Sequence, residues 1–253
     1  MFFVRGVSWK TLATPRWGDK RVGLWVLAII RSTVSLYMWA SLVPYLLYYT
    51  DFWWDYTTHT VWMLEVLFMT SMAVVSGVGL YAPLPSKPSV GASIFNELSG
   101  YLLYFAWLVV IVYWSLLYED PNVSPAVLYW YSNATLHAFN AVIMTFEWLV
   151  VRHEFYWLDV LLDMMFTLLQ FLILTVTYWA TGFFPYPFVP DLPGFSNPGA
   201  LIGWLLLSVV IFPVVGRLVL WAWSSLTSLC LHNPAPVSEQ NFHDGLSYAM
   251  ASV

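Results

Sequence analysis

Charged residues are scarce in this chain of 253 residues, at 9% of the total, whereas a soluble domain averages about 25%. Hydrophobic residues make up 60% and aromatic residues 19%. The apolar runs are about 20 residues or longer and lack the alternation typical of barrel strands. Because only helices and closed barrels satisfy their own backbone in lipid, we predict an all-α, polytopic integral membrane protein.

Other absences narrow the possible functions. The one cysteine, Cys230, excludes an internal disulfide and a cysteine-based metal site. The sequence contains no HExxH or EF-hand pattern and no GxSxG elbow. A formal net charge of −5 argues against a nucleic-acid partner. No small-residue cleavage site follows a short apolar core near the N-terminus, so we expect an uncleaved first span. We expect no metal and no cofactor.

Six apolar segments are long enough to cross a bilayer as helices. The first begins at Val22 or Ile29 and ends at Tyr48, and the others cover residues 58–81, 97–117, 127–151, 156–179 and 200–226. They form one transmembrane domain, residues 22–228. A basic cytosolic segment, residues 1–21, precedes it, and a polar cytosolic tail, residues 229–253, follows it.

The lysines and arginines predict the orientation of these spans. Five of them lie in residues 1–21, Lys87 lies between the second and third spans, and Arg152 lies between the fourth and fifth. The other three loops carry none, so we predict that both termini are cytosolic. Arg31 lies inside the first span, where a charge costs at least ~2.5–3.5 kcal/mol. We expect its side chain to snorkel to the inner surface.

A polar stripe runs along the predicted fourth span. Its members, at spacings of 4, 3 and 7, are Asn133, His137, Asn140 and Glu147. On a helix of 3.6 residues per turn these side chains share one face, and Met144 completes it while Thr145 falls off it. A polar stripe in a membrane is costly unless it faces protein or trapped water, so we expect the other spans to pack around it.

His137 has two interpretations. In the first, it forms a neutral hydrogen bond between helices, as buried polar side chains often do. Alternatively it is a general base that takes a proton from a hydroxyl, with Asn133 and Asn140 orienting its ring.

The acids inside the spans have three interpretations. The residues concerned are Glu65, Glu147, Asp159 and Asp163, the last two in a second helical stripe with Thr167 and Gln170. They hold helices together as paired or protonated carboxyls, they join His137 in a metal site, or they form a proton or ion path.

Three short motifs resemble the androgen-induced-gene family of six-span membrane proteins. The first is Asn133-Ala-Thr-Leu-His137, with Glu147 ten residues after the histidine. The second is Thr60-Val-Trp at the head of the second span, and the third is Thr181-Gly182 followed by Tyr186-Pro-Phe. The order of elements is similar from Arg31 to Leu226. His137-Ala-Phe-Asn140 also resembles the rolling-stone proteins, which are linked to cell fusion.

The first resemblance implies an intramembrane threonine hydrolase that cleaves esters of hydroxy fatty acids. Thr60 would be its nucleophile and His137 its base, with Thr57 and Thr58 as alternative nucleophiles. Asn133, Asn140, Glu147, Glu65 and Asp163 would line the supporting pocket. Membrane lipids and an acyl-chain substrate would be its partners, in the endoplasmic reticulum or plasma membrane.

Two other functions fit the same sequence. One is a non-enzymatic membrane scaffold, a fusion-related protein or an accessory subunit with protein partners in a membrane assembly. The other is a proton- or ion-coupled transporter that uses the intramembrane acids.

Overall fold

The computed structural model describes residues 6–17, 21–48, 57–112, 138–182 and 198–230. Apart from an isolated bridge between Pro15 and Val151, its regular elements within these ranges are helical. They are α1 (Trp9–Ala13), α2 (Arg21–Tyr48), α3 (Thr57–Tyr81), α4 (Val90–Val112), α6 (Asn140–Val150), η5 (Trp157–Asp159), α7 (Val160–Thr181), α8 (Pro198–Leu205), η6 (Leu206–Ile211) and α9 (Phe212–Cys230). In this described part, five helices are long and apolar enough to cross a membrane, which confirms the prediction of a multi-pass helical protein.

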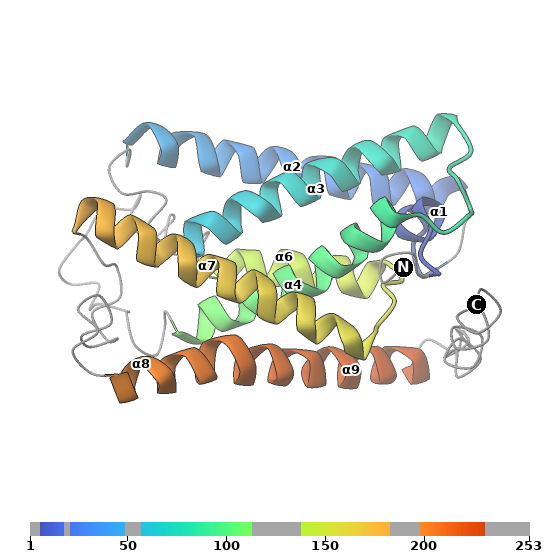
Figure 1. Ribbon diagram of the computed structural model, residues 1–253. Helices are drawn as coiled ribbons and strands as arrows, with labels where there is room; N and C mark the ends of the chain where they lie inside the picture. The colour runs from blue at the N-terminus through green and yellow to red at the C-terminus, as the bar shows by residue number, and fades with distance from the viewer. Residues whose placement is uncertain (1–5, 18–20, 49–56, 113–137, 183–197, 231–253) are drawn as a thin grey trace.

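The long helices form an elongated bundle (Figure 1). The antiparallel pair α2 and α3 lies along one side, and the continuous α8–η6–α9 rod lies along the opposite side. Between them run α4, α6 and α7. The short helix α1 packs where α3 ends and α4 begins, and we call this end of the bundle the α1 end.

Most predicted spans coincide with the helices, but the third begins earlier than expected. Helix α4 starts at Val90, not at Glu97, because Ser89 caps it. The hydroxyl of Ser89 accepts a hydrogen bond from Ala92 N–H at 3.2 Å, and its carbonyl accepts one from Ser93 N–H at 3.0 Å. Glu97 is thus an interior residue of the helix. The first part of the predicted fourth span, up to His137, lies outside the described residues.

The N-terminal segment is folded onto the bundle. Ser8 caps α1 by accepting a hydrogen bond from Thr11 N–H at 3.1 Å, and Val7 and Leu12 are buried. The N–H of Arg16 donates to the carbonyl of Val150 at 2.7 Å, at the end of α6. Residues 7–16 therefore close the α1 end of the bundle.

The last rod contains a π-helical section just before Pro213. Proline lacks an N–H and its ring clashes with the carbonyl four residues earlier, so a regular α-helix cannot continue through it. Here the N–H of Phe212 bonds the carbonyl of Leu207, five residues back, which gives the wider turn. The rod passes through Pro213 without a break, and Arg217 on α9 reaches Glu97 in the first third of α4.

Candidate functional site

The described part of the polar stripe faces the protein interior, as predicted. Asn140, Met144 and Glu147 on α6 are at most 2% exposed, whereas Phe139 and Val142 are 46% and 59% exposed. Helix α6 packs mainly against α4 through this buried face. The side chains of the second stripe, Asp159 at the end of η5 and Asp163, Thr167 and Gln170 on α7, are likewise at most 8% exposed. Both helices therefore turn their polar sides inward and their apolar sides outward.

Arg31 forms the centre of the first buried network, and the prediction that it snorkels to the surface is wrong. Its side chain is fully buried, and its guanidinium holds Glu147 through two hydrogen bonds, Nε donating to Oε2 at 3.1 Å and Nη2 donating to Oε1. It also donates to Ser76 Oγ at 2.6 Å and to the carbonyl of Leu12 at 2.9 Å. Because a carboxylate, a hydroxyl and a carbonyl all lie within reach, the guanidinium is satisfied without water.

His153 joins this network from the turn between α6 and η5. Its Nδ1 lies 2.8 Å from Ser99 Oγ, and its Nε2 lies 3.7 Å from the Glu147 carboxylate. The ring stacks on Trp148 with centroids 4.9 Å apart. Burial of the ring lowers the pKa of His153 and outweighs the neighbouring Glu147, which acts in the opposite direction.

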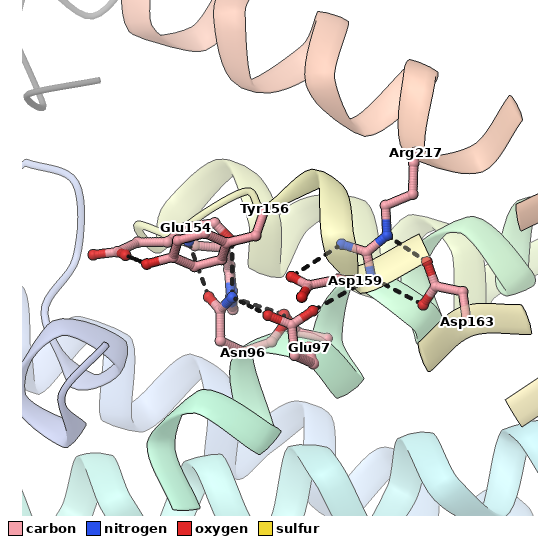
Figure 2. A network of polar contacts seen from close by, with 9 residues as sticks. Asn96, Glu97, Glu154, Tyr156, Asp159, Asp163 and Arg217 are labelled. Carbon is pink, nitrogen blue, oxygen red and sulfur yellow. Dashed lines mark hydrogen bonds and ion pairs between the residues drawn. The ribbon is translucent and has the colours of Figure 1, made fainter. Parts of the chain in front are cut away.

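Arg217 forms the centre of a second buried network (Figure 2). Its guanidinium holds Asp163 through two hydrogen bonds, one of them from Nη2 to Oδ1 at 2.9 Å. Glu97 Oε2 lies 3.4 Å from Nη2, and Asp159 Oδ2 lies 3.7 Å from Nη1. One arginine on α9 thus faces carboxyls from α4, η5 and α7, and this joins three parts of the bundle.

Asn96 connects the second network to the turn before η5 (Figure 2). Its amide donates to the carbonyl of Glu154 at 2.8 Å and accepts from the N–H of the same residue at 2.9 Å. The Glu154 carboxylate in turn accepts a hydrogen bond from the Tyr156 hydroxyl. These contacts fix the turn against α4.

Glu65 on α3 differs from these acids. It is fully buried, and neither carboxyl oxygen has a hydrogen-bond partner among the described residues. Trp62 precedes it by three residues, is also fully buried, and its indole N–H has no acceptor in the same part of the chain. Asn140 repeats the pattern on α6: its Oδ1 accepts the N–H of Ala141, while its Nδ2 has no acceptor within the ranges described.

The proposed nucleophile and base are placed only in part. Thr60 lies near the start of α3, is half-buried, and is five residues before Glu65, which puts the two about 140° apart around the helix. His137 and Asn133 lie outside the described residues, as do the side chains of Thr57 and Thr58. The structure therefore brings Glu147 and Asp163 into ion pairs but gives no distance between Thr60 and His137.

Sequence reasoning allowed that Glu147, Asp159 and Asp163 hold helices together, but it did not identify Arg31 and Arg217 as their partners. It predicted that the Arg31 side chain reaches the membrane surface, and it gave no role to His153. One feature of the sequence could have revealed these pairs. The two arginines inside apolar segments, Arg31 and Arg217, can each pair with an acid on an inward-facing stripe. In the described ranges, no three histidine, cysteine or acidic side chains gather as a metal site would require.

Comparison with known proteins adds no assignment. No family model matches the chain, and the searches of curated proteins and of solved structures found no match.

Proposed function

We propose that this protein is an intramembrane lipid-ester hydrolase, with Thr60 as the nucleophile and His137 as its base. The observation that carries the proposal is the inward face of α6, where Asn140 and Met144 are fully buried. His137 precedes these two residues by three and seven positions, the spacing of one helical face. The resemblance of Thr60-Val-Trp and of the His137 motif to a family of threonine hydrolases agrees with it.

The reaction would proceed by acyl transfer in two steps. The Thr60 hydroxyl attacks the ester carbonyl, His137 takes its proton, and that proton passes to the departing alcohol. Water then attacks the acyl-threonine, His137 again receives the proton, and a fatty acid leaves as Thr60 regains its hydrogen. Asn140 would orient the histidine ring through its amide, since its Nδ2 has no acceptor among the described residues.

The ion pairs argue against the transporter alternative. A proton or ion path needs carboxyls that release and accept their cargo. Arg31 engages Glu147, and Arg217 engages Asp163, each through two hydrogen bonds. These pairs fit a structural role at the α1 end and leave Glu65 as the candidate for a functional carboxyl.

The proposal includes six spans, both termini in the cytosol, and residence in the endoplasmic reticulum or plasma membrane. The turn that carries Lys87 and the turn that carries Arg152 both adjoin the α1 end, next to the basic N-terminal segment. This clustering of basic residues at one end supports a cytosolic α1 end. Cysteines introduced at Ser86 and at Glu119 report the orientation. We expect the first to react with an impermeant maleimide only from the cytosolic side, and the second only from the opposite side.

Labelling of the purified protein by a fluorophosphonate probe tests the enzyme, together with release of fatty acid from a long-chain ester. We expect labelling and hydrolysis to disappear in Thr60→Ala and hydrolysis to fall at least about a hundredfold in His137→Ala. Thr145→Ala is the matched control, because Thr145 lies off the polar face and binds Trp107. Loss of labelling in Thr57→Ala or Thr58→Ala instead would move the nucleophile. An unlabelled, inactive wild type would refute the hydrolase and favour the scaffold.

A further inference from the structure

Glu65 occupies an unusual position in the bundle. It lies eleven residues before Ser76, the α3 residue that binds Arg31, which is about 16 Å along the helix. The Arg31 network includes Leu12 of α1, and the Arg217 network includes Glu97 in the first third of α4, so both lie toward the α1 end. Glu65 lies in the other half of α3. Its side chain is 0% exposed.

The other fully buried acids of the described ranges have a basic partner there, and Glu65 has none among these residues. Glu147 pairs with Arg31, while Asp159 and Asp163 face Arg217. Within the described residues, both oxygens of Glu65 lack any hydrogen-bond partner. Placing a carboxyl in an apolar interior without a partner costs several kcal/mol, so a partner from outside the described protein atoms would relieve that cost.

Trp62 presents a second unsatisfied group beside Glu65. The two residues are three apart on α3, so they are neighbours on one helix face. The indole nitrogen of Trp62 is buried and has no acceptor in the part of the chain that the structure describes. The same face continues with buried Val66, Met69 and Met72, which are apolar. A donor and a carboxyl thus lie side by side among buried apolar side chains of the core.

The chemistry of this pair selects the class of partner. A metal ion would need further ligands, and the described residues contain no cluster of three. The indole can only donate, whereas the carboxyl can accept. A group that both accepts and donates a hydrogen bond, such as a hydroxyl or a carboxylic acid, satisfies both at once. The flanking apolar side chains suit a hydrocarbon chain attached to that group.

We propose that Trp62 and Glu65 form an internal binding site for the hydroxyl or carboxylic acid end of a lipid-like molecule. This inference deepens the proposed function and rests on it, since it names the part of the substrate that α3 would hold. Binding at the site nevertheless needs no ester bond and can be measured separately from hydrolysis.

Photo-crosslinking to the full-length protein in lipid nanodiscs tests the site. Three diazirine probes of equal chain length are compared: a fatty acid, a fatty alcohol, and a hydrocarbon without a polar end. We expect the acid, the alcohol or both to label peptides of α3. In Glu65→Leu that labelling should fall about tenfold, as expected when one or two buried hydrogen bonds are lost. Glu65→Gln, whose amide also donates and accepts, should keep most of it.

The controls separate binding from folding. Val74→Leu changes an apolar residue on the exposed side of α3, opposite the face that carries Trp62 and Glu65, and should label as the wild type does. Trp62→Phe should show an intermediate loss, and the hydrocarbon probe should not distinguish wild type from Glu65→Leu. Leucine at position 65 removes an unpaired acid, so this variant should keep its melting temperature.

The outcomes distinguish the two proposals. Equal labelling of wild type and Glu65→Leu by both polar probes, or cross-links only outside α3, would overturn the binding site. Site-specific labelling in a protein that hydrolyses no ester would support the binding site and refute the enzyme. Hydrolysis that depends on Thr60, combined with labelling that is unchanged in Glu65→Leu, would support the enzyme and overturn the binding site. Labelling by one polar probe alone identifies the acid or the alcohol as the guest.

Discussion

The guanidinium of Arg31 and the carboxylate of Glu147 form a two-hydrogen-bond pair that joins α2 to α6 in the interior of the bundle. The same guanidinium reaches Ser76 on α3 and the carbonyl of Leu12 on α1. Four helices thus meet at one charged group that has no contact with solvent. Because the Glu147 carboxylate, the Ser76 hydroxyl and the Leu12 carbonyl all accept hydrogen bonds from the guanidinium, the pair forms a structural junction between helices.

Replacing Arg31 should therefore be strongly destabilising. Arg31→Met leaves Glu147 buried without its counter-charge, and breaking such a pair costs about 3–5 kcal/mol. We expect a lower melting temperature for the purified protein in detergent, followed by tryptophan fluorescence or by gel filtration after heating. The loosened attachment of Leu12 should also make residues 7–16 accessible to protease.

The double variant Arg31→Met/Glu147→Leu is the control for this prediction. It removes both charges, so most of the lost stability should return. A double variant as unstable as the sum of the two single variants would show that the pair itself is not the source of the effect.

The sequence was sufficient for the class of fold and for the inward faces, but not for the partners of the charged residues. Helical spacing predicted that Asn140, Glu147, Asp159 and Asp163 face inward, because burial of polar side chains in a membrane protein forces one face of each helix toward protein. Which arginine meets which acid depends on how the helices pack, and residue spacing along one chain segment does not contain that information. The prediction for Arg31 was wrong for this reason: it counted the cost of burying the charge but not the Glu147 carboxylate and the further hydrogen bonds that offset this cost.

Glu65 and Glu147 should respond oppositely to the same substitution. Glu65→Leu removes a carboxyl that has no partner in the described residues, so we expect an unchanged or higher melting temperature. Glu147→Leu leaves the Arg31 guanidinium buried without its carboxylate and should lower the stability by about 3–5 kcal/mol. Thermal unfolding of the two variants, measured side by side, checks the contrast. Equal destabilisation by both would mean that Glu65 has a structural partner of its own.

The close approach of α9 to α4 depends on Gly216. A Cβ added there would lie 2.7 Å from Cγ and 2.9 Å from Cβ of Tyr104, atoms that a rotation of the tyrosine ring cannot move away. Gly216→Ala must therefore push the helices apart, and we expect a loss of about 1–3 kcal/mol in stability.

Gly77→Ala is the matched control, because no atom lies within 4 Å of the added carbon. This control should be neutral or stabilising, since alanine favours a helix over glycine. If both variants unfold at the wild-type temperature, the contact between α4 and α9 tolerates more space than its geometry indicates.

His153 should make the stability of the protein depend on pH. Burial lowers its pKa below the ordinary value of about 6.5, so the unfolded chain binds a proton more readily than the folded protein does. The stabilisation is complete above about pH 6.5 and is lost as the pH falls through the folded pKa. The groups that face the ring act in both directions: Glu147 raises the pKa, and Arg31 and Arg16 lower it.

His153→Gln has no titrating ring, so its melting temperature should fall less than that of the wild type between about pH 7.5 and 5. The acids paired with arginine titrate in both proteins, and the difference between the two curves isolates the histidine. Parallel curves would assign the acid sensitivity to the carboxyls instead, and a wild type that gains stability on acidification would reverse the sign derived from the buried ring.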